Sequence, residues 1–284
     1  MIEPRLRPDD LRLWDGWLRT ARLHAGTLAH RRAVEQARRV VEAAAAAAPS
    51  SCYMLSGGKD SSVLVHLAGV TLGLRLPVLS EKDDLDFPGE RVHVEALMAA
   101  WGLELRVLEP EVSPAAWMAA HAAELGPGAD LHSRAAALSK ACFYELVERA
   151  AAPFDGIFLG LRAEESRARA LDQATHFHTD RQGRRLHGLY QRRAGANPGQ
   201  WRACPLHGWQ GIDVYAYAEA HGIPLLPLYR GIAFMHAREP WRVRKSWWVP
   251  GAASRHGGTA WLAHYYPSLF AQLRRWVPAA QGFY

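Results

Sequence analysis

One short stretch, LSGGKDSS at residues 55–62, limits what this chain can fold into more than any other. The apolar residues 52–55 before it are typical of a buried strand, and the apolar residues 63–67 after it are typical of the start of a helix. Two adjacent glycines allow a tight turn between them. The stretch therefore predicts a strand, loop and helix unit, with the loop at the carboxyl end of the strand.

Strands and helices alternate along the rest of the chain. A helical region begins at Pro8, breaks near Gly26 and stops before Pro49. We then expect strands at 51–55, 76–80, 103–108 and 155–160, and helices at 61–72, 89–101, 114–123, 133–150 and 210–221. This order predicts an α/β protein with a mostly parallel sheet and helices on both faces. We divide it into an N-terminal helical region (1–49), an α/β domain (50–230) and an aromatic-rich C-terminal tail that packs on the core (231–284).

Bulk properties exclude several classes of protein. With 284 residues, 49% of them hydrophobic, the chain can bury a large core. No signal peptide and no run of about 18 apolar residues is visible, so we expect a cytoplasmic protein without a membrane segment. The three cysteines, Cys52, Cys142 and Cys204, lie far apart, with no CxxC and no Cys/His ladder, so the sequence supports neither a disulfide framework nor a zinc site.

The loop has the residues of a phosphate-binding site. At a helix N-terminus, unobstructed backbone N–H groups and the helix dipole favour an anion. Lys59 adds a positive charge, and Asp60 either binds Mg²⁺ or braces the loop. A plain glycine turn with a Ser/Asp helix cap is the structural alternative. The nucleotide-binding set that we expect from the loop is Ser56, Gly57, Gly58, Lys59, Asp60, Ser61 and Ser62.

Four segments, in order, resemble one family. SGGKDS resembles the SGGxDS PP-loop of the adenine nucleotide α-hydrolase-like superfamily, whose members cleave ATP between the α and β phosphates or bind adenylylated sulfate. DFPGE (86–90) resembles an FPE element, GLRAEESRAR (160–169) resembles G-x-R-x-x-E-S-x-x-R, and residues 205–229 resemble PL-x-x-W…DVW…IP…PLY. Over roughly 50–230 the chain is similar to the phosphoadenosine phosphosulfate (PAPS) reductase family, which implies a Rossmann-like (HUP-type) fold.

The resemblance implies Mg²⁺-dependent cleavage of ATP, with pyrophosphate as the leaving group. Arginines suit the charge that builds on the departing phosphates. We expect Lys59, Asp60, Arg162 and Arg167 to be catalytic, and Arg162 and Arg169 to bind the nucleotide with the loop. The carboxylates Asp60, Asp84 and Asp86 are the candidate Mg²⁺ ligands, although the segment around Asp83 is equally typical of a solvated loop.

Other features bear on the chemistry that the chain performs. PAPS reductases use a C-terminal nucleophilic cysteine, and no cysteine follows Cys204 in this sequence, so thiol-based reduction is not expected. Iron–sulfur forms need four thiolates, more than the three present. Segment 162–202 holds nine arginines and four acidic residues, which accounts for most of the net charge of +6. That segment favours a phosphorylated ligand or nucleic acid, or is a solvated loop.

Several functions agree with these residues. The preferred one is ATP pyrophosphatase or adenylyl-transfer chemistry in a sulfur-transfer pathway, including DNA phosphorothioation, with a sulfur-transfer partner protein and a homodimer as further expectations. The alternatives are an enzyme similar to the small subunit of sulfate adenylyltransferase, an FMN adenylyltransferase, and a binding protein for adenine nucleotide or nucleic acid without turnover.

The C-terminal tail and the histidines are less informative. Trp241–Trp248 interleaves cations and indoles, which suits base stacking or plain packing, and packing is preferred. Trp261, Tyr265, Leu269 and Leu273 have helical spacing and predict one core-facing helix. We interpret His176, His178 and His207 as packed or surface residues rather than metal ligands.

Overall fold

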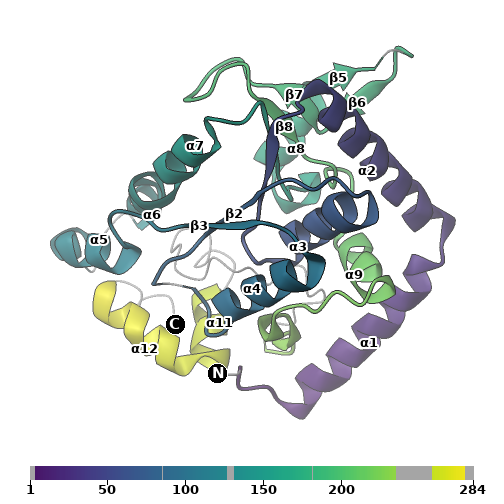
Figure 1. Ribbon diagram of the computed structural model, residues 1–284. Coiled ribbons are helices and arrows are strands. Elements are labelled where there is room, and N and C mark those ends of the chain that lie inside the picture. Colours follow the sequence, from purple (N-terminus) through teal and green to yellow (C-terminus); the bar gives the residue numbers. More distant parts are fainter. Residues whose placement is uncertain (1–3, 85, 127–130, 181, 235–257, 279–284) are drawn as a thin grey trace.

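A mostly parallel six-stranded sheet forms the centre of the protein (Figure 1). The computed structural model describes residues 4–84, 86–126, 131–180, 182–234 and 258–278. Neighbouring strands are parallel except for the β7–β8 pair. The order across the sheet is β3 (Leu105–Leu108), β2 (Val78–Glu81), β1 (Ser51–Met54), β4 (Gly156–Phe158), β8 (Trp201–Ala203) and β7 (Leu189–Gln191). The predicted α/β fold is therefore confirmed.

Helices cover both faces because successive strand residues point in opposite directions. Tyr53 and Phe158 pack with residues of α2, α3, α4 and α9, whereas Cys52 and Ile157 pack against the end of α7 on the other face. None of the described helices is long and apolar enough to cross a membrane. The helices on the sheet are α2 (Leu28–Ala47), α3 (Lys59–Val65), α4 (Glu90–Trp101), α7 (Glu145–Ala151) and α9 (Gly211–Ala220).

The remaining helices surround this layer. The predicted N-terminal break is confirmed: α1 (Pro8–Ala25) ends at Gly26, and Thr27 caps α2 by accepting a hydrogen bond from the His30 N–H at 3.2 Å. The helix expected at 133–150 is α6 (Leu131–Ser139), a π-helical segment (Lys140–Tyr144) and α7. Likewise, α3 continues as a π-helical segment, His66–Thr71, and α5 (Pro114–Ala120) is followed by a 3₁₀ turn.

The sequence predicts an irregular arginine-rich insertion, and this prediction is wrong because the described part of the segment forms regular elements. It contains α8 (Arg167–Thr175), the hairpin β5 (Phe177–Thr179) and β6 (Arg185–His187), then β7 and β8. Strand β8 pairs in parallel with β4 and so extends the central sheet. A strand of three residues with an arginine at its centre has too little periodicity to be recognised from sequence alone.

The described residues 258–278 form two helices rather than the single predicted one. α11 (Gly258–Tyr265) and α12 (Pro267–Trp276) meet at Pro267, where the proline begins the second helix. All four residues of the predicted apolar face are buried, and they pack with Phe87 and Trp117. Trp241–Trp248 lies outside the described residues.

A buried carboxylate joins the two ends of the chain. Asp10 of α1 accepts hydrogen bonds from the N–H groups of Ile232 (2.9 Å) and Ala233 (2.7 Å) and from the Tyr265 hydroxyl (2.5 Å). Burial by itself raises the pKa of Asp10, but the Tyr265 hydroxyl and three backbone N–H groups lower it below its usual range. The charged form is therefore the one that the fold stabilises.

Replacement of Asp10 by Ala is expected to lower the free energy of unfolding by about 2–3 kcal/mol, because three backbone donors and a tyrosine hydroxyl lose their acceptor. Since the folded pKa is depressed, this stabilisation is present above the unfolded pKa and is lost as pH falls through the folded value. Urea unfolding of the wild-type protein and of Asp10→Ala at pH 7 and at pH 3 measures this loss of stabilisation. Asp9→Ala, which removes an exposed ion pair with Arg12, is the matched control and is expected to be near neutral.

The chain after β4 passes directly against the start of α3. A Cβ atom on Gly160 would lie 2.7 Å from the Ser61 backbone nitrogen and 2.8 Å from its Cα. Both are backbone atoms and cannot rotate away, so only glycine allows this approach. Gly160 therefore brings the PP-loop and the residues that follow β4 into contact.

We expect Gly160→Ala to destabilise the fold by about 1–3 kcal/mol through overpacking against the loop. Gly208→Ala is the matched control, because a Cβ there meets no atom within 4 Å. Urea unfolding midpoints of the two variants compare them. Equal midpoints would contradict the packing argument.

Candidate functional site

The PP-loop is held in a defined conformation by its own residues. Gly57 has a φ of 71°, in the left-handed region that favours glycine, and Gly58 is the N-cap of α3. The Ser61 hydroxyl donates to the Gly58 carbonyl at 3.0 Å and lies 3.1 Å from the Ser56 hydroxyl. The seven predicted residues are consecutive: residues 56–58 lie in the loop, and residues 59–62 are the first four residues of α3.

A tyrosine from the far end of the family motif supports this turn. The Lys59 N–H donates to the Tyr229 hydroxyl at 2.9 Å, and the Lys59 ammonium lies 5.6 Å from the centre of the same ring. Burial, reinforced by the charge of Asp60, raises the pKa of Tyr229 well above its usual value, so this hydroxyl stays protonated. The sequence analysis did not select Tyr229, although it lies in the PLY segment that carried the resemblance.

Asp60 lies between two cations. Its Oδ2 is 2.6 Å from Lys59 Nζ, and its Oδ1 accepts a hydrogen bond from Arg162 Nε at 2.6 Å. The side chains of Lys59 and Arg162 are 3% and 0% exposed. Burial alone raises the pKa of Asp60, but the two cations outweigh it and lower the pKa below its usual range. Asp60 therefore braces the loop as a carboxylate.

Arg162 extends this network to α9. Its Nη1 donates to Glu164 Oε2 at 2.5 Å, and the same carboxylate accepts from the Gly211 N–H at 2.7 Å. Glu165 accepts from the Arg162 backbone N–H at 3.2 Å and pairs with Arg169. Burial lowers the pKa of Arg162, but nearby carboxylates raise it overall, so the guanidinium stays charged.

The network is electrically neutral as a unit. It contains three cations and three anions: Lys59, Arg162 and Arg169 with Asp60, Glu164 and Glu165. An anion at this site is therefore attracted by the backbone N–H groups and helix dipole of the loop rather than by excess side-chain charge.

Two buried donors at the loop lack a hydrogen-bond partner within the described residues. They are Arg162 Nη2 and the Ser62 hydroxyl, whose residues are 0% and 1% exposed. Buried polar groups are normally paired, and leaving one unpaired costs about 1–3 kcal/mol. An anion bound against the loop is the kind of partner that satisfies both donors.

The other predicted residues have different positions. Arg167 begins α8 and is exposed. Asp84 accepts from the Ala115 N–H with both oxygens, at 3.2 and 3.3 Å, and so caps α5. Within the described ranges, Asp60, Asp84 and Asp86 do not form a group whose ligand atoms all lie within 4.8 Å of one another. Their placement gives no support to the predicted Mg²⁺ site.

The three thiols are not suited to nucleophilic chemistry. All three cysteines are buried, and burial raises the pKa of Cys52 and Cys204 to about 12 and that of Cys142 to about 11. A thiolate is the reactive form, so these side chains are inert at neutral pH.

Most described arginines of the basic segment are paired with acidic side chains. Arg184 binds Asp180 at 2.7 Å, and Arg192 and Arg202 bind Glu148 at 2.6 and 3.4 Å. Arg162 and Arg169 belong to the loop network. Glu164, Glu165 and Asp180 are already counted among the four acidic residues of the segment, so this pairing holds the arginines in place but leaves most of the excess positive charge.

A cavity of about 450 Å³ lies away from this network. Its lining includes Asp155, Gly199 and Trp201, at the amino ends of β4 and β8. Ligands of parallel sheets bind at the carboxyl ends of the strands, where the PP-loop lies. The cavity is therefore not part of the candidate site.

Comparison with known proteins identifies relatives that match 62–70% of this chain. Sulfate adenylyltransferase subunit 2 of Xanthomonas axonopodis pv. citri (strain 306) is 30% identical over 190 residues, covering 62% of this chain and 59% of that protein. The protein of the same name from Streptomyces lavendulae is 27% identical over 213 residues, covering 70% and 60%. The chain thus spans about three fifths of the length of these relatives.

Solved structures with a similar arrangement include PAPS reductase from Candida auris (TM-score 0.49, 16% identity, 66% of this chain and 81% of that one). Candida glabrata FMN adenylyltransferase is another (TM-score 0.47, 17% identity, 78% and 67%). The phosphoadenosine phosphosulfate reductase domain family matches residues 50–233, which is more than half of the chain. The resemblance carried by the four motifs is confirmed, and this chain belongs to the phosphoadenosine phosphosulfate reductase domain family of PP-loop proteins.

Proposed function

We propose that this protein cleaves MgATP between the α and β phosphates and transfers the adenylyl group to a small oxyanion of the sulfate class. The observation that carries the proposal is the buried Lys59–Asp60–Arg162 network, which fixes the PP-loop and leaves donors at Arg162 Nη2 and Ser62 without a partner. Preorganised donors of this kind suit phosphate groups whose charge increases during the reaction.

The loop and Arg162 would hold the phosphates, each in a different way. The Lys59 N–H donates to Tyr229, so the N–H groups of Asp60 and Ser61 in the first turn of α3 would hold the anion, and Ser62 would add a hydroxyl donor. Arg162 would donate through Nη2 while its other nitrogens stay bound to Asp60 and Glu164. In-line attack by the acceptor needs no side-chain nucleophile, in agreement with the three inert thiols.

Asp60 acts as a positioning residue in this account. Both of its oxygens are engaged by cations, and the proposal assigns Asp60 no metal ion. The Mg²⁺ in the proposal therefore arrives with ATP as part of the substrate, and no step is assigned to a protein-held ion. Bound to the phosphates, Mg²⁺ would neutralise charge that the neutral side-chain network does not.

The names of the relatives favour sulfate as the acceptor class. Two of them, from different genera, are called sulfate adenylyltransferase subunit 2, and the word subunit supports a partner protein for this chain as well. The basic segment keeps most of its positive charge although several of its arginines are paired, so a nucleic-acid acceptor stays an alternative. Flavin and DNA remain as comparison acceptors in the test.

Asp60→Asn is expected to reduce α–β cleavage at least about 100-fold, because the uncharged amide no longer orients Lys59 and Arg162. The assay follows α-labelled ATP with Mg²⁺ and sulfate, FMN or DNA, and identifies AMP, adenylylated product and pyrophosphate. Sulfate is expected to stimulate the wild-type reaction, and FMN and DNA are not.

Asp84→Asn is the matched control. Asp84 is an exposed carboxylate that caps α5, so this variant is expected to retain activity within about twofold. Loss of activity in Asp84→Asn would instead support the predicted metal role. Binding of MgATP without turnover under every addition, and with a candidate partner present, would favour a binding protein and overturn the proposal.

A further inference from the structure

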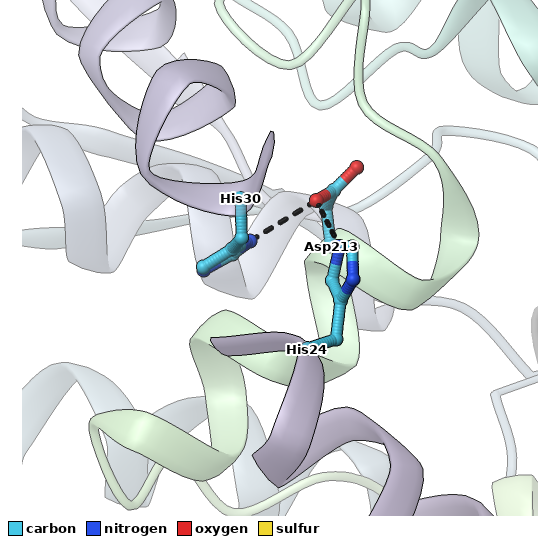
Figure 2. Close-up of side chains that lie close together, drawn as sticks. All are labelled: His24, His30 and Asp213. Atoms are coloured by element: carbon cyan, nitrogen blue, oxygen red, sulfur yellow. Dashed lines mark hydrogen bonds and ion pairs between the residues drawn. The ribbon is translucent and has the colours of Figure 1, made fainter. Parts of the chain in front are cut away.

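Three helices bring two histidines and an aspartate together outside the PP-loop. His24 is in the last turn of α1, His30 in the first turn of α2 and Asp213 in the first turn of α9. Figure 2 shows both imidazole rings directed at one carboxylate oxygen. His24 Nε2 lies 2.8 Å and His30 Nδ1 3.0 Å from Asp213 Oδ1. Among the described residues this is the one such group of three whose ligand atoms all lie within 4.8 Å.

Burial and orientation distinguish this group from chance surface neighbours. The side chains of His30 and Asp213 are 6% and 8% exposed, and that of His24 is 21% exposed. The second oxygen of Asp213 accepts from the Gln210 N–H at 2.9 Å, which fixes the carboxylate. Burial raises the pKa of Asp213, but hydrogen bonds from His30, His24 and Gln210 lower it overall, so the carboxylate is ionised.

The donor set has the chemistry of an open zinc site. Two imidazoles and a carboxylate are borderline ligands that suit Zn²⁺ rather than Mg²⁺, and zinc sites with three protein ligands take water as the fourth. The partial exposure of His24 leaves a side from which that water reaches the ion. The Gln210 hydrogen bond to Asp213 is an outer contact of the type that orients metal ligands.

The two observed nitrogen–oxygen distances are close to those between ligands of one ion, and all three ligand atoms lie within 4.8 Å of one another. Tetrahedral coordination at about 2.0–2.1 Å places neighbouring ligand atoms about 3.3 Å apart. The two nitrogen–oxygen distances of 2.8 and 3.0 Å therefore have to widen by only a few tenths of an ångström. His24 can supply that movement because it is partly exposed and precedes the Gly26 break between α1 and α2.

We propose that His24, His30 and Asp213 bind one Zn²⁺ ion, with water completing the site. Without the ion, the same side chains form the hydrogen bonds seen in Figure 2. The ion would link the junction between α1 and α2 to the first turn of α9. That turn also carries Gly211, whose N–H binds Glu164, the partner of Arg162. Zinc binding would thereby stabilise the PP-loop network from outside, and it does not depend on the proposed reaction.

The test is zinc binding by the full chain without a histidine tag. Protein freed of metal with a chelator is titrated with Zn²⁺ against a chromogenic chelator, and thermal unfolding is measured with and without Zn²⁺. Wild type is expected to bind one equivalent and to unfold at a higher temperature when loaded. His24→Ala, at the most exposed ligand, is expected to fold, to bind at least about tenfold more weakly and to lose the thermal shift.

His176→Ala is the matched control. His176 also contacts an aspartate, Asp172, at 3.3 Å, but the pair is exposed, and no third ligand joins it among the described residues. This variant is expected to bind zinc as wild type does. His30→Ala repeats the test at the buried ligand. Equal zinc affinity and equal thermal shifts in wild type and His24→Ala, or loss of binding in His176→Ala alone, would overturn the proposal.

Discussion

The carboxylate of Asp60, held between Lys59 and Arg162, is the interaction on which the rest of the site depends. It joins the first residues of α3 to the chain that follows β4, two segments that adjoin in the sheet because β1 and β4 are paired. A buried ion pair of this kind is costly to break, because removal of one partner leaves an uncompensated charge. The fold therefore fixes a loop with two cations at its base, and Gly160 permits the close approach that the pairing needs.

Contacts from distant parts of the chain converge on the same loop. Tyr229 reaches the Lys59 N–H, Glu164 connects Arg162 to α9, and α9 packs beside α1 and α2, which run along one side of the molecule in Figure 1. The network has no net charge, so affinity for phosphate must come from backbone N–H groups and the unpaired donors. Asp60 and Glu164 already bind Lys59 and Arg162, so a bound nucleotide would bring its own Mg²⁺.

The sequence was sufficient for the elements whose physical signals are local. The apolar residues before LSGGKDSS predict β1, the glycines predict the turn, and the motif spacing identified Arg162. The sequence alone was insufficient where a feature depends on residues that only the fold brings together. Strand β8 is too short to show periodicity, and two arginines of the basic segment pair with Glu148, which precedes that segment in the sequence. His24 and His30 are separated from Asp213 by 189 and 183 positions, so only the folded helices bring the three together.

Two ATP analogues, supplied with Mg²⁺ and sulfate, test the central claim most directly. In the α,β-methylene analogue the bond proposed to break is replaced by a carbon bridge, and in the β,γ-methylene analogue that bond is intact. The account predicts that the wild-type protein releases methylenediphosphonate from the β,γ-methylene analogue and releases nothing from the α,β-methylene analogue. Release of inorganic phosphate from the α,β-methylene analogue would contradict the account, because it would place cleavage at the β–γ bond.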